Sequence, residues 1–374
     1  LDSISRIANT ASFAGLQLLN GSLEYLTSGV DSSKVDGVDV HSAQFGTQSD
    51  INVSAEVVSS AQTAQLFLSG NTTGATGELQ SSVTIEIAGN DGVQTLSFVS
   101  GVSLSGVVEA VNTLRDATGV SASLVDSTDQ TSGLVFNSVD YGSDQFVSVK
   151  KVGEGGDFFA TFDQQGGNQT QRDEGQDVTA VVNGALARGD GLEISLNEQT
   201  LSLDMSLQPS FATNVGATES FRITGGGANF QIGPTVNATQ QVGFGVKSIA
   251  ASRLGGTRIN GSRFFLDSLK SGGTNSILNG KAQEASQILD TAITEVSQLR
   301  GRLGAFERNT LQTNERSLEI GVENITASES IIRDADFAEE TAKLSRAQIL
   351  SQAGTSVLQT ANTSAQNVLA LLGG

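Results

Sequence analysis

Residues 334–374 read DADFAEETAKLSRAQILSQAGTSVLQTANTSAQNVLALLGG, and this segment carries the clearest structural pattern in the chain. It contains no Pro, no aromatic residue after Phe337 and a single Gly before its last two residues. Apolar residues recur mostly three, four or seven positions apart, with Ala in many of the gaps, which predicts a helix with a thin apolar stripe. A thin stripe buries little surface alone, so we expect this helix to pack against helices of other molecules.

The apolar residues of this helix are therefore candidates for a contact between subunits. An Ala-lined stripe suits tight packing in a ring of like helices, and an ordinary bundle within one subunit is the alternative. The candidate subunit-assembly residues are Leu344, Ile349, Leu350, Val357, Leu358, Val368, Leu369 and Leu372.

A second helical pattern precedes the first, and its apolar residues alternate between steps of three and four. Such spacing predicts a seam for helices that cross at a small angle, here with N-terminal helices of the same chain. We expect Asp334–Phe337 to separate the two helices, because acidic residues favour a helix N-terminus. The seam residues are Val296, Leu299, Leu303, Phe306, Leu318, Val322 and Ile325.

The middle of the chain has the two-residue period of β-strands. Within 78–160, VTIEIAG and VQTLSFV flank an N-D-G turn and predict a hairpin, and residues 104–114 predict a helix ended by Gly119. VSASLVD, GLVFNSVD and DQFVSVKKV follow as strands. INVSAEVV predicts a strand before a helix-like SSAQTAQLFLSG, and residues 178–207 repeat the hairpin pattern with N-G and D-G turns.

Composition excludes several classes of protein. The formal net charge of −19 argues against binding to nucleic acid or to anionic lipid. The absence of Cys excludes disulfides, zinc–thiolate sites and thiol catalysis. No run of eighteen apolar residues could span a membrane, and the start shows no signal peptide. The chain opens within an amphipathic pattern and without Met, so we expect an N-terminally truncated fragment.

Motifs for chemistry are missing as well. We find no H-E-x-x-H, no EF-hand series and no phosphate loop, so we expect no enzyme, no catalytic residue, no cofactor and no metal. We expect the single His, His41, to lie in a loop and to have no catalytic role. For a glycan-binding protein, Phe158, Phe159 and Phe162 beside a Gly-rich segment are the candidate aromatic residues.

Three segments resemble bacterial flagellin, the family of flagellar filament subunits. The longest is residues 332–372, with the ungapped run SRAQILSQAGTSVL. ISRIANTASFAGLQLLNGS, residues 4–22, resembles the flagellin segment that leaves a core helix and enters a turn. The third, PTVNATQQVGFGVKSIAASRLG at residues 234–255, resembles the strand that returns to the core. In addition, residues 178–207 resemble the IN motif of flagellins and hook-associated proteins.

This resemblance implies a secreted, extracellular subunit that self-assembles through its terminal helices into the flagellar filament for motility. It also implies partners: copies of the chain itself, an export chaperone, a filament cap and hook-junction proteins. In the family the terminal segments order only on polymerisation. A hook–filament junction protein and a flagellin-like adhesin remain as alternatives.

The expected fold class is α+β, with a coiled-coil-like helical core and β-rich domains inserted in the middle. The expected segments are an N-side core remnant with a loop (1–45), a connecting strand and helix (46–77), a β-rich outer module (78–175), a second outer module with an IN-like motif (176–232), a C-side helical core domain (233–333) and a C-terminal polymerisation helix (334–374).

Overall fold

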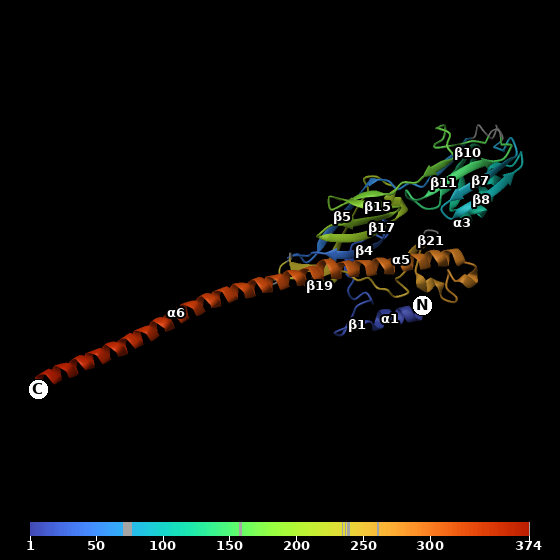
Figure 1. The fold of residues 1–374 in the computed structure, drawn as a ribbon. Helices are drawn as coiled ribbons and strands as arrows, with labels where there is room; N and C mark the ends of the chain where they lie inside the picture. The colour runs from blue at the N-terminus through green and yellow to red at the C-terminus, as the bar shows by residue number, and fades with distance from the viewer. Residues whose placement is uncertain are drawn as a thin grey trace. The chain divides into compact units, whose positions relative to one another are not determined.

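The computed structural model is α+β, as the sequence predicted, and forms two compact units, residues 1–299 and 300–374 (Figure 1). It describes residues 1–69, 77–156, 159–233, 235, 237, 240–259 and 262–373, with the backbone alone at 334–336.

The first unit contains an eight-stranded antiparallel sheet in the order β3-β18-β5-β14-β15-β16-β17-β4. Alternate side chains along these strands enter one apolar core, which includes the fully buried Ile194, Leu203, Met205 and Ile223. The short helix α4 (Pro209–Ala212) adds Phe211 to that core. The strands are β3 (Tyr25–Ser28), β4 (Val35–Ala43), β5 (Ile51–Ser59), β14 (Thr179–Val182), β15 (Ala185–Asp190), β16 (Glu193–Asn197), β17 (Leu201–Leu207) and β18 (Thr218–Gly226).

A second core lies within two four-stranded sheets, ordered β12-β6-β10-β9 and β13-β11-β7-β8. Leu66, Ile85, Leu104 and Phe136 are fully buried in it. Its elements are β6 (Gln65–Ser69), β7 (Val83–Gly89), β8 (Gly92–Phe98), α2 (Leu104–Thr113), α3 (Arg115–Thr118), β9 (Val120–Asp126), β10 (Asp129–Ser138), β11 (Phe146–Val152), β12 (Thr161–Phe162) and β13 (Arg172–Glu174).

Most local predictions for this part are confirmed. β7 and β8 form the predicted hairpin, and β9, β10 and β11 are the three predicted strands. Ser103 caps α2, because its hydroxyl accepts a hydrogen bond from the Gly106 N–H at 3.2 Å. Gly119 ends α3 at φ 71°, in the left-handed region that favours glycine.

The helix-like prediction for SSAQTAQLFLSG is wrong, since Gln65–Ser69 is strand β6. Leu66 pairs with Phe136 in β10, and Leu66 and Leu68 are buried while Phe67 points to the other face. Pairing with a distant strand therefore overrides the local pattern.

A third core lies in the remaining part of the first unit. It joins the N-terminal residues of this unit to its C-terminal part. Ala251, Leu254, Leu266, Ile288 and Ala292 form it, and Leu1 and Ile4 pack against them. Its elements are α1 (Asp2–Thr10), β1 (Ser12–Phe13), β2 (Leu16–Gln17), β19 (Ala228–Gln231), β20 (Gln241–Phe244), β21 (Thr257–Ile259), β22 (Ser262–Phe264), η3 (Leu266–Leu269), η4 (Ile277–Asn279) and the helix α5 (Ala282–Phe306).

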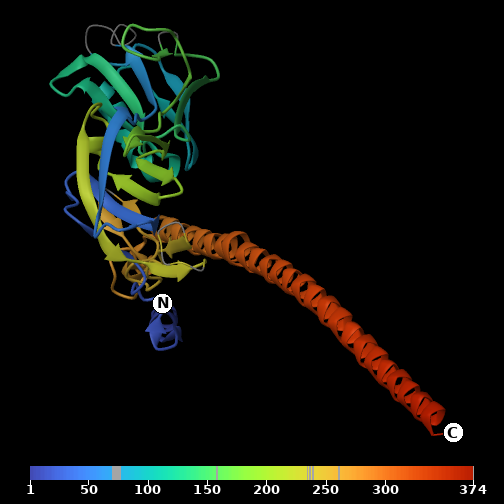
Figure 2. The same ribbon diagram turned by 90° about the vertical axis from the view of Figure 1, so that its left-hand side faces the viewer.

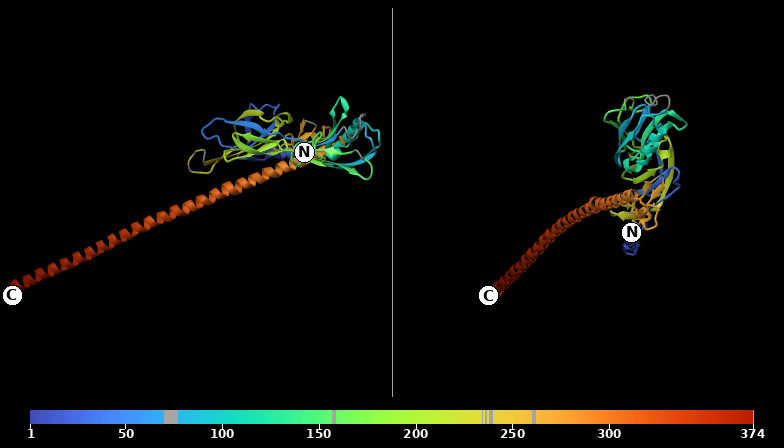
Figure 3. Two further views of the ribbon diagram at one scale, coloured as in Figure 1. Left: turned by 90° about the horizontal axis from the view of Figure 1, so that it is seen from above. Right: turned by 90° about the vertical axis from the view of Figure 1, so that its right-hand side faces the viewer.

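The second unit is dominated by α6 (Gln312–Leu372), which follows a π-helical turn at Glu307–Leu311. Figure 2 and Figure 3 show α6 as one gently curved helix without a break. The separation predicted at Asp334–Phe337 is therefore wrong: that segment holds no Pro or Gly, and Asp alone costs a helix interior well under about 1 kcal/mol. Of the helices described, none is long and apolar enough to cross a membrane.

Candidate assembly surface

The C-terminal part of α6 exposes its large apolar side chains. All eight predicted assembly residues are exposed, from 54% at Val368 to 83% at Leu372. Helix α6 has 61 residues and is therefore about 90 Å long. A helix of this length with an exposed apolar stripe has the form of an interaction surface rather than of a core element.

Most of these residues lie on one side of the helix. At about 100° per residue, seven of the eight fall within an arc of about 140°, and Ile349 lies outside it. Ala347, Gly354 and Ala361 fall inside the same arc and recur every seven residues. In the described chain nothing approaches within 4 Å of a Cβ built on Gly354. The surface therefore combines large apolar side chains with small positions where another helix can come close.

The N-terminal part of α6 carries a narrower apolar stripe. Leu318, Val322 and Ile325 are 53%, 64% and 71% exposed and stand within an arc of about 60°. Leu318 and Val322 line a shallow groove together with Leu311 and Asn314. Its acidic flank is formed by Glu315, Glu319 and Glu323, each four residues from the next, so like charges face one another along the helix.

The earlier seam residues are in a different environment. Val296 in α5 packs against the third core, and Leu299 and Phe306 are half-buried, whereas Leu303 is 39% exposed. The structure thus brings Val296 into the first unit and leaves the residues of α6 exposed. That all seven pack against N-terminal helices of the same chain stays a prediction.

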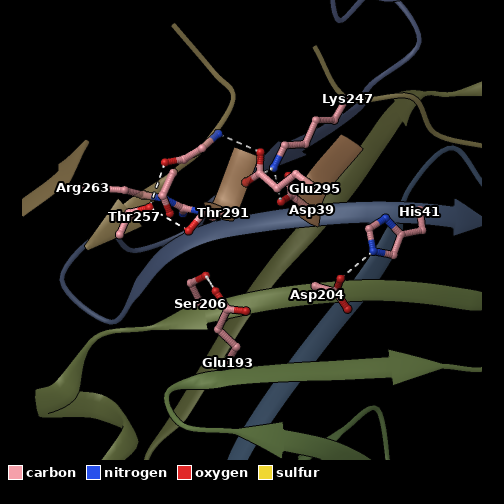
Figure 4. A network of polar contacts seen from close by, with 12 residues as sticks. Asp39, His41, Glu193, Asp204, Ser206, Lys247, Thr257, Arg263, Thr291 and Glu295 are labelled. Atoms are coloured by element: carbon pink, nitrogen blue, oxygen red, sulfur yellow. Dashed lines mark hydrogen bonds and ion pairs between the residues drawn. The ribbon is translucent and has the colours of Figure 1, made fainter. Parts of the chain in front are cut away.

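A half-buried ion-pair network links the eight-stranded sheet to α5 (Figure 4). Lys247 Nζ donates to Asp39 Oδ2 in β4 at 3.0 Å and to Glu295 Oε1 in α5 at 3.3 Å. Glu295 Oε2 also accepts from the Gly255 N–H at 2.9 Å. Burial alone lowers the pKa of Lys247, but Asp39 and Glu295 together raise that pKa above its ordinary value. The lysine is therefore held charged between the eight-stranded sheet and α5.

Further polar contacts surround Lys247 in the same region. Thr257 Oγ1 donates to Thr291 Oγ1 in α5 at 2.9 Å, and Arg263 Nε donates to the Gly256 carbonyl at 3.2 Å. Glu193 accepts from the Ser206 hydroxyl at 3.0 Å on the sheet (Figure 4). The Thr257–Thr291 contact joins the β21–β22 hairpin to α5, whereas the other two lie at the hairpin and within the sheet.

The prediction of a loop position for His41 is wrong. His41 lies in β4, and its Nε2 is 2.7 Å from Asp204 Oδ2 in β17. The side chain is 17% exposed and serves as a cross-strand pair. Among the described residues, no group of three or more His, Cys, Asp or Glu side chains could hold a metal ion.

The aromatic residues considered for glycan binding do not form an exposed platform in the described part of the chain. Phe158 lies outside the described residues. Phe159 packs against the second core and is half-buried, and Phe162 is half-buried in β12 opposite Phe67.

Comparison with protein families identifies two regions. The profile described as "Bacterial flagellin C-terminal helical region" matches residues 286–372, and "Flagellin hook IN motif" matches residues 84–140. The IN motif therefore lies on the β7–β10 module and not at residues 178–207, where its turn pattern was expected. Both segments contain Gly-closed hairpins, so turns alone did not distinguish them.

Individual relatives agree with these profiles. Flagellin of Bacillus subtilis (strain 168) is 30% identical over 215 residues, which cover 56% of this chain and 68% of that protein. The flagellar filament 30.7 kDa core protein of Treponema maltophilum is 36% identical over 42% of this chain and 52% of its own length. Flagellin of Salmonella typhimurium is 32% identical over 49% of this chain and 35% of its own length.

Among solved structures, the D2-D3 domains of the flagellar cap protein FliD from Serratia marcescens align with a TM-score of 0.34 at 14% identity. That alignment covers 50% of this chain and 98% of the FliD chain. The helical profile, the IN motif and the coverage of the Bacillus relative together show the family. The chain belongs to the bacterial flagellins, the structural subunits of the flagellar filament.

Proposed function

We propose that this chain enters the filament by burying the apolar side of α6 against α6 of neighbouring copies. One observation carries the proposal: the eight predicted assembly residues between Leu344 and Leu372 are all exposed, on a helix with small residues at seven-residue intervals. A surrounding layer is proposed for the seam residues, which would pack against N-terminal helices of the same chain: Val296, Leu299, Leu303, Phe306, Leu318, Val322 and Ile325.

The energetics support association over an isolated helix. Full burial of a Leu, Ile or Val side chain stabilises by roughly 1.5–3 kcal/mol, so the eight residues together offer on the order of 10–20 kcal/mol before ordering costs. The stability of a helix in a protein comes mainly from packing of its apolar side, which is exposed in the single chain. We therefore expect α6 to be marginal in the monomer and to order fully on assembly.

The proposed contact is of the open kind. A surface that contacts a different surface of the next copy repeats without closing and yields a helical assembly. In such an assembly the β-rich part between residues 46 and 232 faces solvent, where the chain's net charge of −19 favours solubility. The six segments expected from the sequence are proposed as an order along the chain, although the eight-stranded sheet and α6 each continue across a segment boundary.

Further partners follow from the same exposed helix. Before assembly, an export chaperone would bind this exposed apolar surface. At the growing end of the filament, a cap protein would bind. At the base of the filament, hook-junction proteins would meet the same helical ends. Export to the outside of the bacterium and a role in motility belong to this proposal.

Deletion of Ser345–Gly374 from the full-length protein tests it. We expect a soluble monomer that keeps the thermal unfolding transition of its β-rich part, with no filaments in electron micrographs at concentrations where the undeleted protein polymerises. Normal filaments from the deleted protein would contradict the proposal.

A further inference from the structure

Strand β8 is an open edge of the sheet β13-β11-β7-β8. The opposite edge, β13, is three residues long and every residue in it is charged. Strand β8 has seven residues, reads GVQTLSF, and contains neither a charged residue nor Pro. Short length and charge are the usual protection of an edge strand, so β13 is protected and β8 is not.

The neighbouring sheet shows how an edge is covered in this module. Its edge strand β9 is capped by Asn112 of α2, whose Nδ2 donates to the Ala122 carbonyl at 2.9 Å and whose Oδ1 accepts from the Ala122 N–H at 2.8 Å. The other edge, β12, has only two residues. In the described part of the chain, β8 has no backbone hydrogen-bond partner for residues 93–97 beyond β7.

The backbone groups that face outward can be assigned from the hairpin. Gly89 and Gly92 close the two-residue turn as partners, so the hydrogen-bonded positions of β8 alternate from Gly92. The outward N–H and C=O groups then belong to Val93, Thr95 and Ser97. The Ser97 hydroxyl lies 2.9 Å from that of Thr84, as suits the closer, non-hydrogen-bonded pair. Val93 is 54% exposed, and Thr95 and Ser97 are exposed too.

We propose that β8 pairs in antiparallel fashion with β8 of a second copy of this chain, with Thr95 opposite Thr95. This register overlaps all seven residues and places Val93 opposite Ser97 and Gln94 opposite Leu96. Since the strand is uncharged, two chains of net charge −19 meet there without like charges in contact. On the same face, Glu86 in β7 lies opposite Lys150 in β11, so these two neighbouring charges have opposite signs.

The symmetry of this contact separates it from the α6 surface. Antiparallel pairing of one strand with itself requires a two-fold axis, and successive copies along a polar helical polymer are not related by one. The β8 contact therefore joins free chains in solution or chains on two filaments that lie side by side. It does not depend on the proposed role of α6.

Disulfide capture tests the register, because the chain has no Cys of its own. In the proposed pair, Thr95→Cys places two Cα atoms about 5.5 Å apart, within the range of about 4.4–6.8 Å that a disulfide spans. Val93→Cys is the matched control: it is exposed on the same strand, but its two copies lie about 14 Å apart. Both full-length variants would be oxidised at equal concentration, after circular dichroism has shown the same fold.

We expect the Thr95→Cys chain to form the covalent dimer at least 10-fold faster than the Val93→Cys chain. Equal rates would mean random collision or association elsewhere, and no dimer in either variant would mean that β8 stays unpaired. Each of these two results overturns the proposal, as does faster capture at position 93. None of the three bears on filament formation through α6.

Discussion

The ammonium of Lys247 donates to the Glu295 carboxylate across 3.3 Å and thereby ties the segment after β20 to helix α5. The same ammonium pairs with Asp39 in β4. One side chain, only 28% exposed, thus links the eight-stranded sheet to the part of α5 within the first unit.

Replacement of this lysine should destabilise the first unit. Lys247→Met leaves two half-buried carboxylates facing each other, and we expect the free energy of unfolding to fall by about 1–3 kcal/mol. Urea denaturation followed by circular dichroism measures it. Lys270→Met is the control, because Lys270 pairs with Asp2, whose side chain is 95% exposed, and such a pair contributes little. Equal losses in the two variants would contradict a special role for Lys247.

Glu24, close to the same network, gives a prediction about pH. Burial raises the pKa of Glu24 above its ordinary value of 4.5, Asp39 raises it further, and Arg253 and Lys247 partly offset the rise. Folding therefore favours the protonated form, so stability is lost as the pH rises from about the ordinary value through the raised folded value. Glu24→Gln should stabilise the protein at pH 7 by less than about 1 kcal/mol and have no such effect below pH 4.

Denaturation midpoints of the Glu24 variant at the two pH values check this sign. Glu109→Gln, on the exposed side of α2, serves as the control and should change neither midpoint. A Glu24 variant that is less stable at pH 7 would mean that the carboxylate is needed in its charged form.

A substitution at Gly354 tests the helix propensity of α6 and its packing in the assembly separately. Gly354→Ala should favour the isolated helix by about 1 kcal/mol, because no atom of the chain is near the added methyl group. The same methyl group would prevent close approach of a second helix, so we expect slower polymerisation, measured by light scattering. Gln359→Ala, on the opposite side of α6, should leave the rate unchanged. Faster polymerisation of the Gly354 variant would argue against close packing there.

The acidic flank of α6 predicts opposite effects for two similar substitutions. Glu319→Gln removes repulsion from Glu315 and Glu323, and helicity of the dilute protein should rise by an amount equivalent to about 0.2–0.5 kcal/mol for each pair. Glu329→Gln breaks the ion pair of 3.0 Å with Arg333 and should lower helicity. Both effects should fade at about 1 M salt, where the screening length is about 3 Å. Circular dichroism at low and high salt distinguishes them.

The sequence was most informative where structure is local. Alternation and the N-D-G turn predicted the β7–β8 hairpin, and heptad spacing predicted the exposed side of α6, because both patterns depend on residues close in the chain. The network of Lys247 could not be predicted in this way, since Lys247 and Asp39 are 208 positions apart. Strand β6 was missed for the same reason: its partner in β10 decides its conformation.

The measurement closest to the central claim is amide hydrogen exchange across residues 344–372, in the dilute protein and in assembled filaments. We predict fast exchange throughout this segment in the dilute chain, because its apolar side is exposed and the helix opens readily. In filaments the same amides should be strongly protected. Equal protection in both samples, independent of concentration, would contradict an α6 that is stabilised by other copies.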